Sequence, residues 1–152
     1  MQQEVREINL IIIHCSATRV DRDFTAKDID TAHRVRGFSS WAYHYYIRKD
    51  GTIEPMRDES EIGAHCLGHN RDSIGVCYEG GIDENGRPAD TRTLLQKASL
   101  QILVRSLKRK YPSADIVGHR DLSPDRNLNG RIEPHEWIKQ CPCFEVRRER
   151  WD

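Results

Sequence analysis

Two histidines and one cysteine occupy positions where separate elements of the chain are expected to end. His14 closes the apolar run 8–13, His119 follows the apolar segment 115–118, and Cys141 directly precedes a proline. Two imidazoles and one thiolate can hold a tetrahedral zinc ion and leave its fourth position open for water, as in catalytic zinc sites. Each residue alone is more often structural than a ligand. The case for a zinc site therefore depends on their joint placement.

The elements that would carry these residues read as a mixed sheet. Apolar runs predict strands at 8–13, 73–78 and 115–118. Residues 43–48 and 52–55 are joined by a turn ending in Gly51, so they predict an antiparallel hairpin.

Two helices alternate with these strands. The first is predicted to begin at Thr25, with Asp28 at the capping-box position, and to end at Gly37. Its expected buried stripe is Ile29, Ala32, His33 and Val35. The second helix is predicted over residues 91–110, and its expected apolar stripe is Leu94, Leu95, Ala98, Ile102, Val104 and Leu107.

This alternation predicts an α/β fold, a central mixed sheet covered by helices. Active sites in such sheets form where the carboxyl ends of strands meet loops. His14 and His119 both follow apolar strands. If those strands are neighbours, the two imidazoles can share one metal although 119 − 14 = 105 positions separate them.

Composition narrows the class of protein. The 152 residues fit one domain, 1–152. The 24 basic residues balance 24 acidic ones, which gives no reason to expect nucleic-acid binding. Five scattered cysteines do not form the paired framework of a small secreted scaffold. No apolar run has membrane-spanning length, and the first seven residues lack the apolar core of a signal peptide.

Six segments, in order, resemble the zinc-dependent N-acetylmuramoyl-L-alanine amidases, a family that includes T7-type phage lysozyme and the peptidoglycan recognition proteins. They span about nine tenths of the chain. The matching segments are 13–18, 43–51, 63–65 with Asn70, 73–77, 118–120 and 139–142. Their shared order is more specific than any one motif.

The resemblance implies that His14, His119 and Cys141 hold Zn2+ with a water as fourth ligand, which the metal activates for attack on an amide. Tyr43 and Lys139 match the family's catalytic tyrosine and lysine, which can donate hydrogen bonds to a developing oxyanion.

The implied substrate is peptidoglycan, cut between N-acetylmuramic acid and the first L-alanine of the stem peptide. His65 and Asn70 match a stretch that borders the family's cleft, so they are expected to contact substrate. The implied fold agrees with the mixed sheet read from periodicity.

An alternative function is a noncatalytic module that binds peptidoglycan without cutting it. Members of the family that only bind tend to lack the third ligand, so Cys141 favours an enzyme. A protein-binding regulator is a third candidate, which no residue of the chain favours. Cys15 and Cys143 lie beside predicted ligands, but strand alternation and Pro142 are expected to turn their side chains away.

The second and third predicted ligands lie 141 − 119 = 22 positions apart, and the insertion between them contains an EF-hand-like loop at 125–136. Asp125, Asn127 and Asn129 would supply side-chain oxygens to Ca2+, Arg131 its carbonyl, and Glu136 a bidentate carboxylate. No helix precedes Asp125, and asparagines lower the ligand charge. The alternative is a polar loop organised by Asx turns, with a short helix near Pro134.

We expect a chain made in the cytoplasm without a signal peptide, which reaches the cell wall after holin-type release or other export. It is expected to act as a monomer on peptidoglycan and its muropeptides, without inserting into a membrane. A phage or prophage lysin fits these features, and so does a bacterial enzyme.

Overall fold

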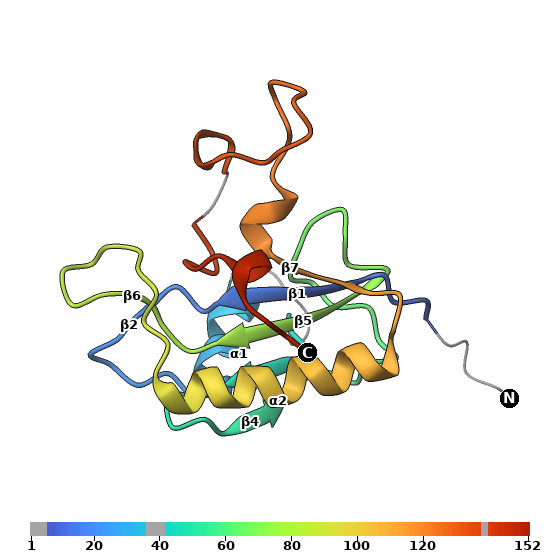
Figure 1. The fold of residues 1–152 in the computed structure, drawn as a ribbon. Coiled ribbons are helices and arrows are strands. Elements are labelled where there is room, and N and C mark those ends of the chain that lie inside the picture. Colours follow the sequence, from blue (N-terminus) through green and yellow to red (C-terminus); the bar gives the residue numbers. More distant parts are fainter. Residues whose placement is uncertain (1–5, 36–41, 138–139) are drawn as a thin grey trace, which may run out of the picture.

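The computed structural model describes residues 6–35, 42–137 and 140–152. A five-stranded sheet in the order β4-β3-β5-β1-β7 forms its centre (Figure 1). The strands are β1 (Leu10–Cys15), β3 (Tyr45–Ile47), β4 (Ile53–Pro55), β5 (Ser73–Tyr78) and β7 (Asp115–Gly118). β4 runs antiparallel to β3, and all other neighbours are parallel. The predicted mixed sheet is confirmed.

Strand alternation along β1 assigns its residues to two different faces. Ile11 and Ile13 pack in the apolar cluster that includes Leu100 and Val104 of helix α2 (Leu94–Lys110). Ile12 belongs to a separate cluster with Val117. Because successive side chains of a strand point to opposite faces, His14 lies on the face of Ile12, away from α2.

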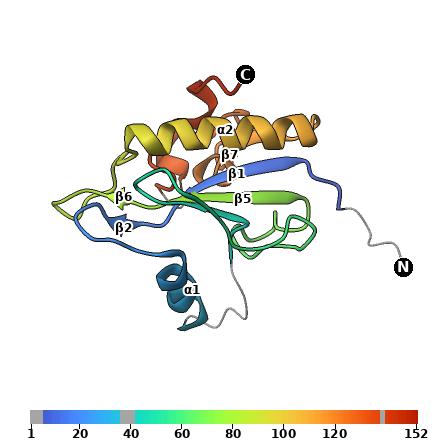
Figure 2. The same ribbon diagram turned by 90° about the horizontal axis from the view of Figure 1, so that it is seen from below.

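The two helices cover opposite faces of the sheet (Figure 2). α1 (Ala26–Val35) begins with the predicted capping box, in which Thr25 and Asp28 bond each other's backbone N–H groups. α2 begins with an equivalent box formed by Thr93 and Gln96. Both helices therefore begin where local sequence chemistry satisfies their first N–H groups.

The predicted apolar stripe of α2 is wrong in its first half. Leu94 is 83% exposed and Ile102 is 66% exposed, whereas Leu100, Leu103, Val104 and Leu107 are buried. Gln96 takes a fully buried position because its side-chain amide donates to the carbonyls of Ile47 and Glu79. The hydrogen bonds of Gln96 therefore determine which face of α2 is buried. Hydropathy alone had placed Leu94 and Ile102 on that face.

Other predicted boundaries also shift. The first strand begins at Leu10 and continues through Cys15, so His14 lies inside the strand. The expected strand 43–48 shortens to β3, and Tyr43 precedes it. On α1, Ile29 is buried but Ala32 and Val35 are exposed, because Asp30 takes a buried position. Gly37, the predicted helix end, lies outside the described residues.

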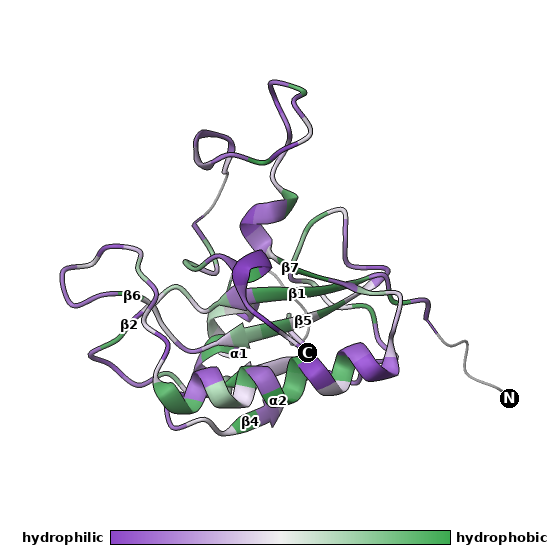
Figure 3. Ribbon diagram, viewed as in Figure 1, coloured by the Kyte–Doolittle hydropathy of each residue, from purple (hydrophilic) through white to green (hydrophobic). Residues whose placement is uncertain are grey.

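The remaining elements are short. β2 (Thr18–Arg19) and β6 (Gly81–Ile82) form a two-stranded parallel sheet. The 3₁₀ helices are η1 (His119–Leu122), η2 (Pro134–Glu136) and η3 (Val146–Arg148). The segment between η1 and η2 projects from the sheet (Figure 1) and is largely hydrophilic, whereas the central strands are hydrophobic (Figure 3). Among the described residues, no helix has the length and apolarity needed to cross a bilayer.

Candidate metal centre

Two neighbouring parallel strands place the two histidines together. β1 pairs with β7, and Ile13 lies opposite Gly118. Because His14 follows Ile13 and His119 follows Gly118, the two histidines lie at the same end of neighbouring strands. Their ring centroids lie 4.6 Å apart. At Gly118, an added Cβ would lie 2.8 Å from Pro142, which explains why this position before His119 has no side chain.

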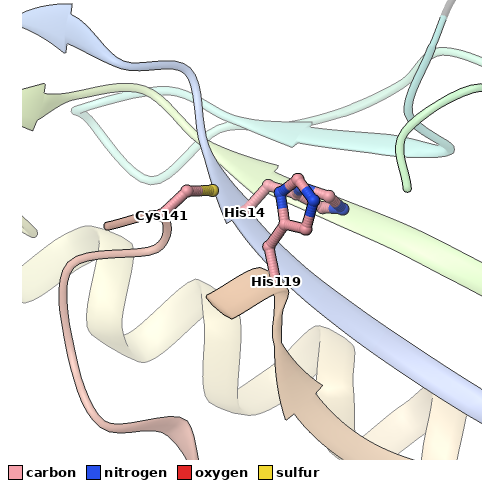
Figure 4. Close-up of side chains that lie close together, drawn as sticks. All are labelled: His14, His119 and Cys141. Atoms are coloured by element: carbon pink, nitrogen blue, oxygen red, sulfur yellow. The ribbon is translucent and has the colours of Figure 1, made fainter. Parts of the chain in front are cut away.

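Cys141 comes from a separate segment that two hydrogen bonds hold against the same strands. The Arg120 N–H donates to the Cys141 carbonyl at 2.9 Å, and the Cys15 N–H donates to Cys141 Sγ at 3.1 Å. One ligand atom each of His14, His119 and Cys141 lies within 4.8 Å of the others (Figure 4). The structure therefore brings together the three residues predicted as zinc ligands.

The chemistry of this donor set fits zinc. Two imidazole nitrogens and one sulfur are borderline-soft ligands, and a three-residue set leaves one tetrahedral position for a further ligand. No other group of three or more His, Cys, Asp or Glu residues in the described parts of the chain is close enough to share a metal.

Cys15 and Cys143 lie near the third ligand but outside this group, as expected. Both pack against the cluster that faces α2. The hydrogen bond with Cys141, together with burial, raises the pKa of Cys15 to about 12. Cys15 therefore remains a thiol at neutral pH in the absence of a metal.

Tyr43 lies beside the first predicted ligand. Its ring centroid is 5.0 Å from that of His14. Burial raises the pKa of Tyr43 well above its usual range, so the phenol keeps its proton and remains a hydrogen-bond donor. Lys139, the other predicted catalytic residue, lies outside the described residues.

A hollow of about 630 Å³ adjoins the centre and contains both residues predicted to contact substrate. It is lined by Ala64, His65, Cys66, Leu67, His69, Asn70, His119, Leu122, Ser123 and Pro124. Contact of His65 and Asn70 with a substrate stays a prediction.

His65 and Asn70 also have partners within the protein. His65 is only 8% exposed, and its Nδ1 lies 2.8 Å from His14 Nε2. Burial lowers the pKa of His65 to about 3, which keeps its imidazole neutral. Asn70 Oδ1 accepts the backbone N–H groups of His65 and Cys66, each at 2.9 Å. Asn70 therefore organises the loop that carries His65.

Two further residues belong to this arrangement and were not predicted from the sequence. Ser73 Oγ lies 3.1 Å from His65 Nε2. A Cβ added at Gly75 would lie 2.6 Å from the His65 ring. A glycine inside a strand often marks such a close approach, so Gly75 was a readable signal, whereas Ser73 carried none.

The predicted calcium residues form a hydrogen-bonded polar loop. Asp125, Asn127 and Asn129 accept the N–H groups of Gly130, Asn129 and Arg131 through their side chains.

Glu136 lies in η2 and accepts the N–H groups of Arg126 and Glu133, while Asp125 Oδ1 is buried without a protein partner. The observed Asx turns and short helix match the alternative expectation for residues 125–136. Calcium binding stays a prediction.

Comparison with known proteins gives concordant results. Residues 4–142 match the family described as Amidase_2, N-acetylmuramoyl-L-alanine amidase. The endolysin of Escherichia phage T7 is 36% identical over 138 residues, which cover 91% of this chain and 82% of that protein.

Among solved structures, the N-acetylmuramoyl-L-alanine amidase LysC from Clostridium intestinale is 33% identical with a TM-score of 0.71, covering 93% of this chain and 80% of that one. A mutant of Drosophila PGRP-LB in complex with tracheal cytotoxin has a TM-score of 0.70 at 19% identity, covering 95% of this chain and 80% of that one. At that identity the likeness concerns the fold alone.

Proposed function

The chain belongs to the N-acetylmuramoyl-L-alanine amidase family, and from that premise we propose that it is a zinc-dependent hydrolase of peptidoglycan. The bond that it cleaves is the amide between N-acetylmuramic acid and the first L-alanine of the stem peptide. The family match and the amidase and endolysin relatives support this substrate and reaction.

One observation carries the zinc dependence, the convergence of His14, His119 and Cys141 within 4.8 Å. These residues come from three segments far apart in sequence: the sheet aligns the segments of His14 and His119, and hydrogen bonds to Cys15 and Arg120 hold Cys141 beside them. A zinc ion held there would act as a Lewis acid toward the scissile carbonyl and toward water. The hollow to which His119 contributes adjoins these three residues.

Tyr43 would contribute to the reaction as a hydrogen-bond donor. Its phenol remains protonated because burial raises its pKa, so it donates a hydrogen bond to the carbonyl oxygen of the scissile amide. That bond strengthens as negative charge develops on the oxygen, which makes it selective for the transition state. Lys139 would act as a second donor, and this role rests on the family resemblance alone.

The cell wall is the site of action that the endolysin relatives support. We assign the chain a lytic or remodelling role there, acting as a monomer on peptidoglycan and muropeptides. Access to the wall would follow holin-type release or another export route.

Digestion of purified peptidoglycan, followed by mass spectrometry of the products and measurement of zinc in the same sample, tests the proposal. We expect free stem peptides with an N-terminal L-alanine, and about one zinc per chain. Cys141→Ala should abolish both results, whereas Cys143→Ser, a change at the neighbouring thiol outside the ligand group, should preserve them.

The alternative function, a noncatalytic binding module, predicts a different outcome. In that case the protein would sediment with peptidoglycan but release no stem peptide, with or without added zinc. Full activity in Cys141→Ala would instead contradict the metal assignment and leave the amidase reaction to other residues.

A further inference from the structure

A buried row of polar side chains extends from His14 away from the metal centre. His14 Nε2 lies 2.8 Å from His65 Nδ1, and His65 Nε2 lies 3.1 Å from Ser73 Oγ. The three residues are 1%, 8% and 0% exposed. Because buried polar groups need hydrogen-bond partners, the contacts within the row stabilise the placement of all three side chains.

The short distance between His14 and His65 identifies their contact as a hydrogen bond. Two nitrogens bound to one tetrahedral zinc at about 2.05 Å would lie about 3.3 Å apart. The observed 2.8 Å is shorter, and it matches the spacing of a donor and an acceptor. His65 is therefore a partner of the ligand His14 and not an additional ligand.

The hydrogen bond also assigns the protons along the row. A neutral imidazole has one N–H group and one lone pair. Since His14 Nε2 is engaged with His65, Nδ1 is the atom of His14 that would bind zinc, and the proton of His14 is then on Nε2. His65 Nδ1 must accept that proton, so His65 carries its own proton on Nε2 and donates to Ser73 Oγ.

We propose that His65 is a positioning residue for the zinc site, which orients the His14 ring and fixes its tautomer, and that Ser73 in turn fixes the tautomer of His65. This inference rests on the proposed zinc-dependent function. Partners of this kind orient metal-binding histidines and increase their basicity. His65 acts through His14, whether or not it also contacts substrate.

The packing around His65 permits little other placement of the ring. A Cβ at Gly75 would lie 2.6 Å from His65 Cγ, and a Cβ at Gly63 would lie 2.8 Å from His65 Cδ2. The side-chain oxygen of Asn70 accepts the backbone N–H of His65 and so holds that backbone in place. The ring is thus confined by the backbone at Gly63 and Gly75 and by the loop that carries His65. Such confinement is expected of a residue that positions another side chain.

Zinc affinity, measured by competition with a chromophoric chelator, tests the proposal separately from activity. We expect His65→Ala to raise the zinc dissociation constant about 10-fold to 100-fold. His65→Asn should recover part of the affinity, because its Oδ1 can occupy the place of Nδ1 and accept from His14. His69→Ala removes an imidazole from the same loop and should retain the wild-type affinity.

Zinc-binding outcomes distinguish this inference from the proposed function. If the wild-type protein binds no zinc, the proposed function fails and the inference fails with it. If the wild-type protein binds zinc and folded His65→Ala binds it equally tightly, only the inference is overturned.

A second measurement applies even if His65→Ala does not fold. Long-range ¹H–¹⁵N NMR spectra of the zinc-loaded wild-type protein report which ring nitrogen of each histidine carries the proton. We expect the Nε2–H tautomer for both His14 and His65. A proton on Nδ1 of His65 would overturn the proposal.

Discussion

Tyr43 is the described residue that we propose acts on the reacting amide. Its ring lies 5.0 Å from that of His14, and its phenol keeps its proton. Tyr43→Phe removes one hydroxyl and should leave zinc content unchanged. We expect kcat to fall about 100-fold, the loss of one oxyanion donor. Steady-state kinetics on a soluble muropeptide measure this, and a change in KM alone would argue for a binding role.

His44 makes stability depend on pH. It is fully buried, its Nδ1 accepts the Gly75 N–H, and its Nε2 faces the Glu61 carbonyl. Its pKa is lowered from 6.5 to about 4, chiefly by burial; Arg6 and Arg57 also lower the pKa, while the Glu61 contact and Glu59 oppose the shift.

The direction of the pH effect follows from the lowered pKa. Above pH 6.5 the histidine is neutral in both states, and the folded protein has its full stability. Between pH 6.5 and pH 4 only the unfolded chain binds the proton, so the free energy of unfolding falls by up to about 1.4 kcal/mol per pH unit. Urea unfolding at pH 7.5 and pH 5 should show a smaller difference for His44→Asn than for the wild-type protein. An equal difference would contradict the prediction.

At the scale of elements, Arg6 attaches the loop 57–72 to the start of the sheet. Its guanidinium donates to the carbonyls of Glu59, Asn70, Arg71 and Ser73. That loop carries His65, so Arg6 supports the site from a distance. An arginine can satisfy several carbonyls at once because its donors diverge in one plane, which a lysine cannot reproduce.

Arg6→Lys should therefore destabilise the protein although it preserves the charge. We expect a loss of about 2 kcal/mol, or roughly 6 °C in Tm. Faster hydrogen exchange should be confined to residues 57–72. Arg109→Ala, at an exposed position of α2, serves as the control and should change neither quantity. Uniformly faster exchange throughout the sheet would argue against a local role for Arg6.

The loop 125–136 carries the calcium prediction at this same scale. Glu136 is 2% exposed and its carboxylate accepts backbone N–H groups, so hydrogen bonds within the loop define its conformation. If Ca2+ binds, calorimetry on metal-stripped protein should detect it, and calcium should raise the Tm of the wild-type protein more than that of Glu136→Ala. Equal Tm values for the two proteins in excess calcium, or no heat of binding, would count against a calcium site.

Local chemistry in the sequence predicted the start of α1, whereas α2 begins at Leu94 and not at the expected residue 91, and the buried faces of both helices were predicted only in part. Thr25 with Asp28 marked the first turn of α1 because a capping box needs only neighbouring residues. The phase of α2 depends on Gln96, whose partners are the carbonyl of Ile47 in β3 and the carbonyl of Glu79 just after β5. Hydrogen bonds between a buried polar side chain and residues distant in sequence cannot be predicted from the hydropathy of one segment.

At the scale of the whole molecule, the candidate metal centre connects parts of the chain that the sheet alone does not join. His14 lies in β1, His119 begins η1, and Cys141 follows the projecting segment. A ligand that binds only the folded state stabilises it by an amount that grows with its concentration, about 4 kcal/mol at roughly 1,000 times Kd.

Removal of zinc should therefore lower the Tm as well as abolish activity. Thermal unfolding with a strong chelator, and again after zinc is restored, should show a reversible shift in Tm. The same comparison on His14→Ala should show no zinc-dependent shift. If chelation abolishes activity but leaves the Tm unchanged, the ion does not contribute to holding these segments together.

The order of six motifs predicted the fold and the three converging residues, because motifs 13–18 and 118–120 lie at the ends of the neighbouring strands β1 and β7, and Cys141 of the last motif is held against them. The contact between His14 and His65 spans 65 − 14 = 51 positions and depends on the loop between β4 and β5. No spacing rule places a loop residue against a strand residue at 2.8 Å. For that reason the sequence predicted only that His65 borders the cleft, and the contact between His65 and His14 became visible only in the structure.

The alternation along β1 also limits how this strand can change in evolution. Ile13 anchors the sheet to α2, whereas the adjacent His14 serves the opposite face. Substitution by another apolar residue at position 13 would alter packing only slightly. Deletion of a single residue before His14 would exchange the two faces, placing the imidazole of His14 in the hydrocarbon interior and Cys15 at the candidate metal centre. We therefore expect homologues to vary in the composition of this strand but not in its length.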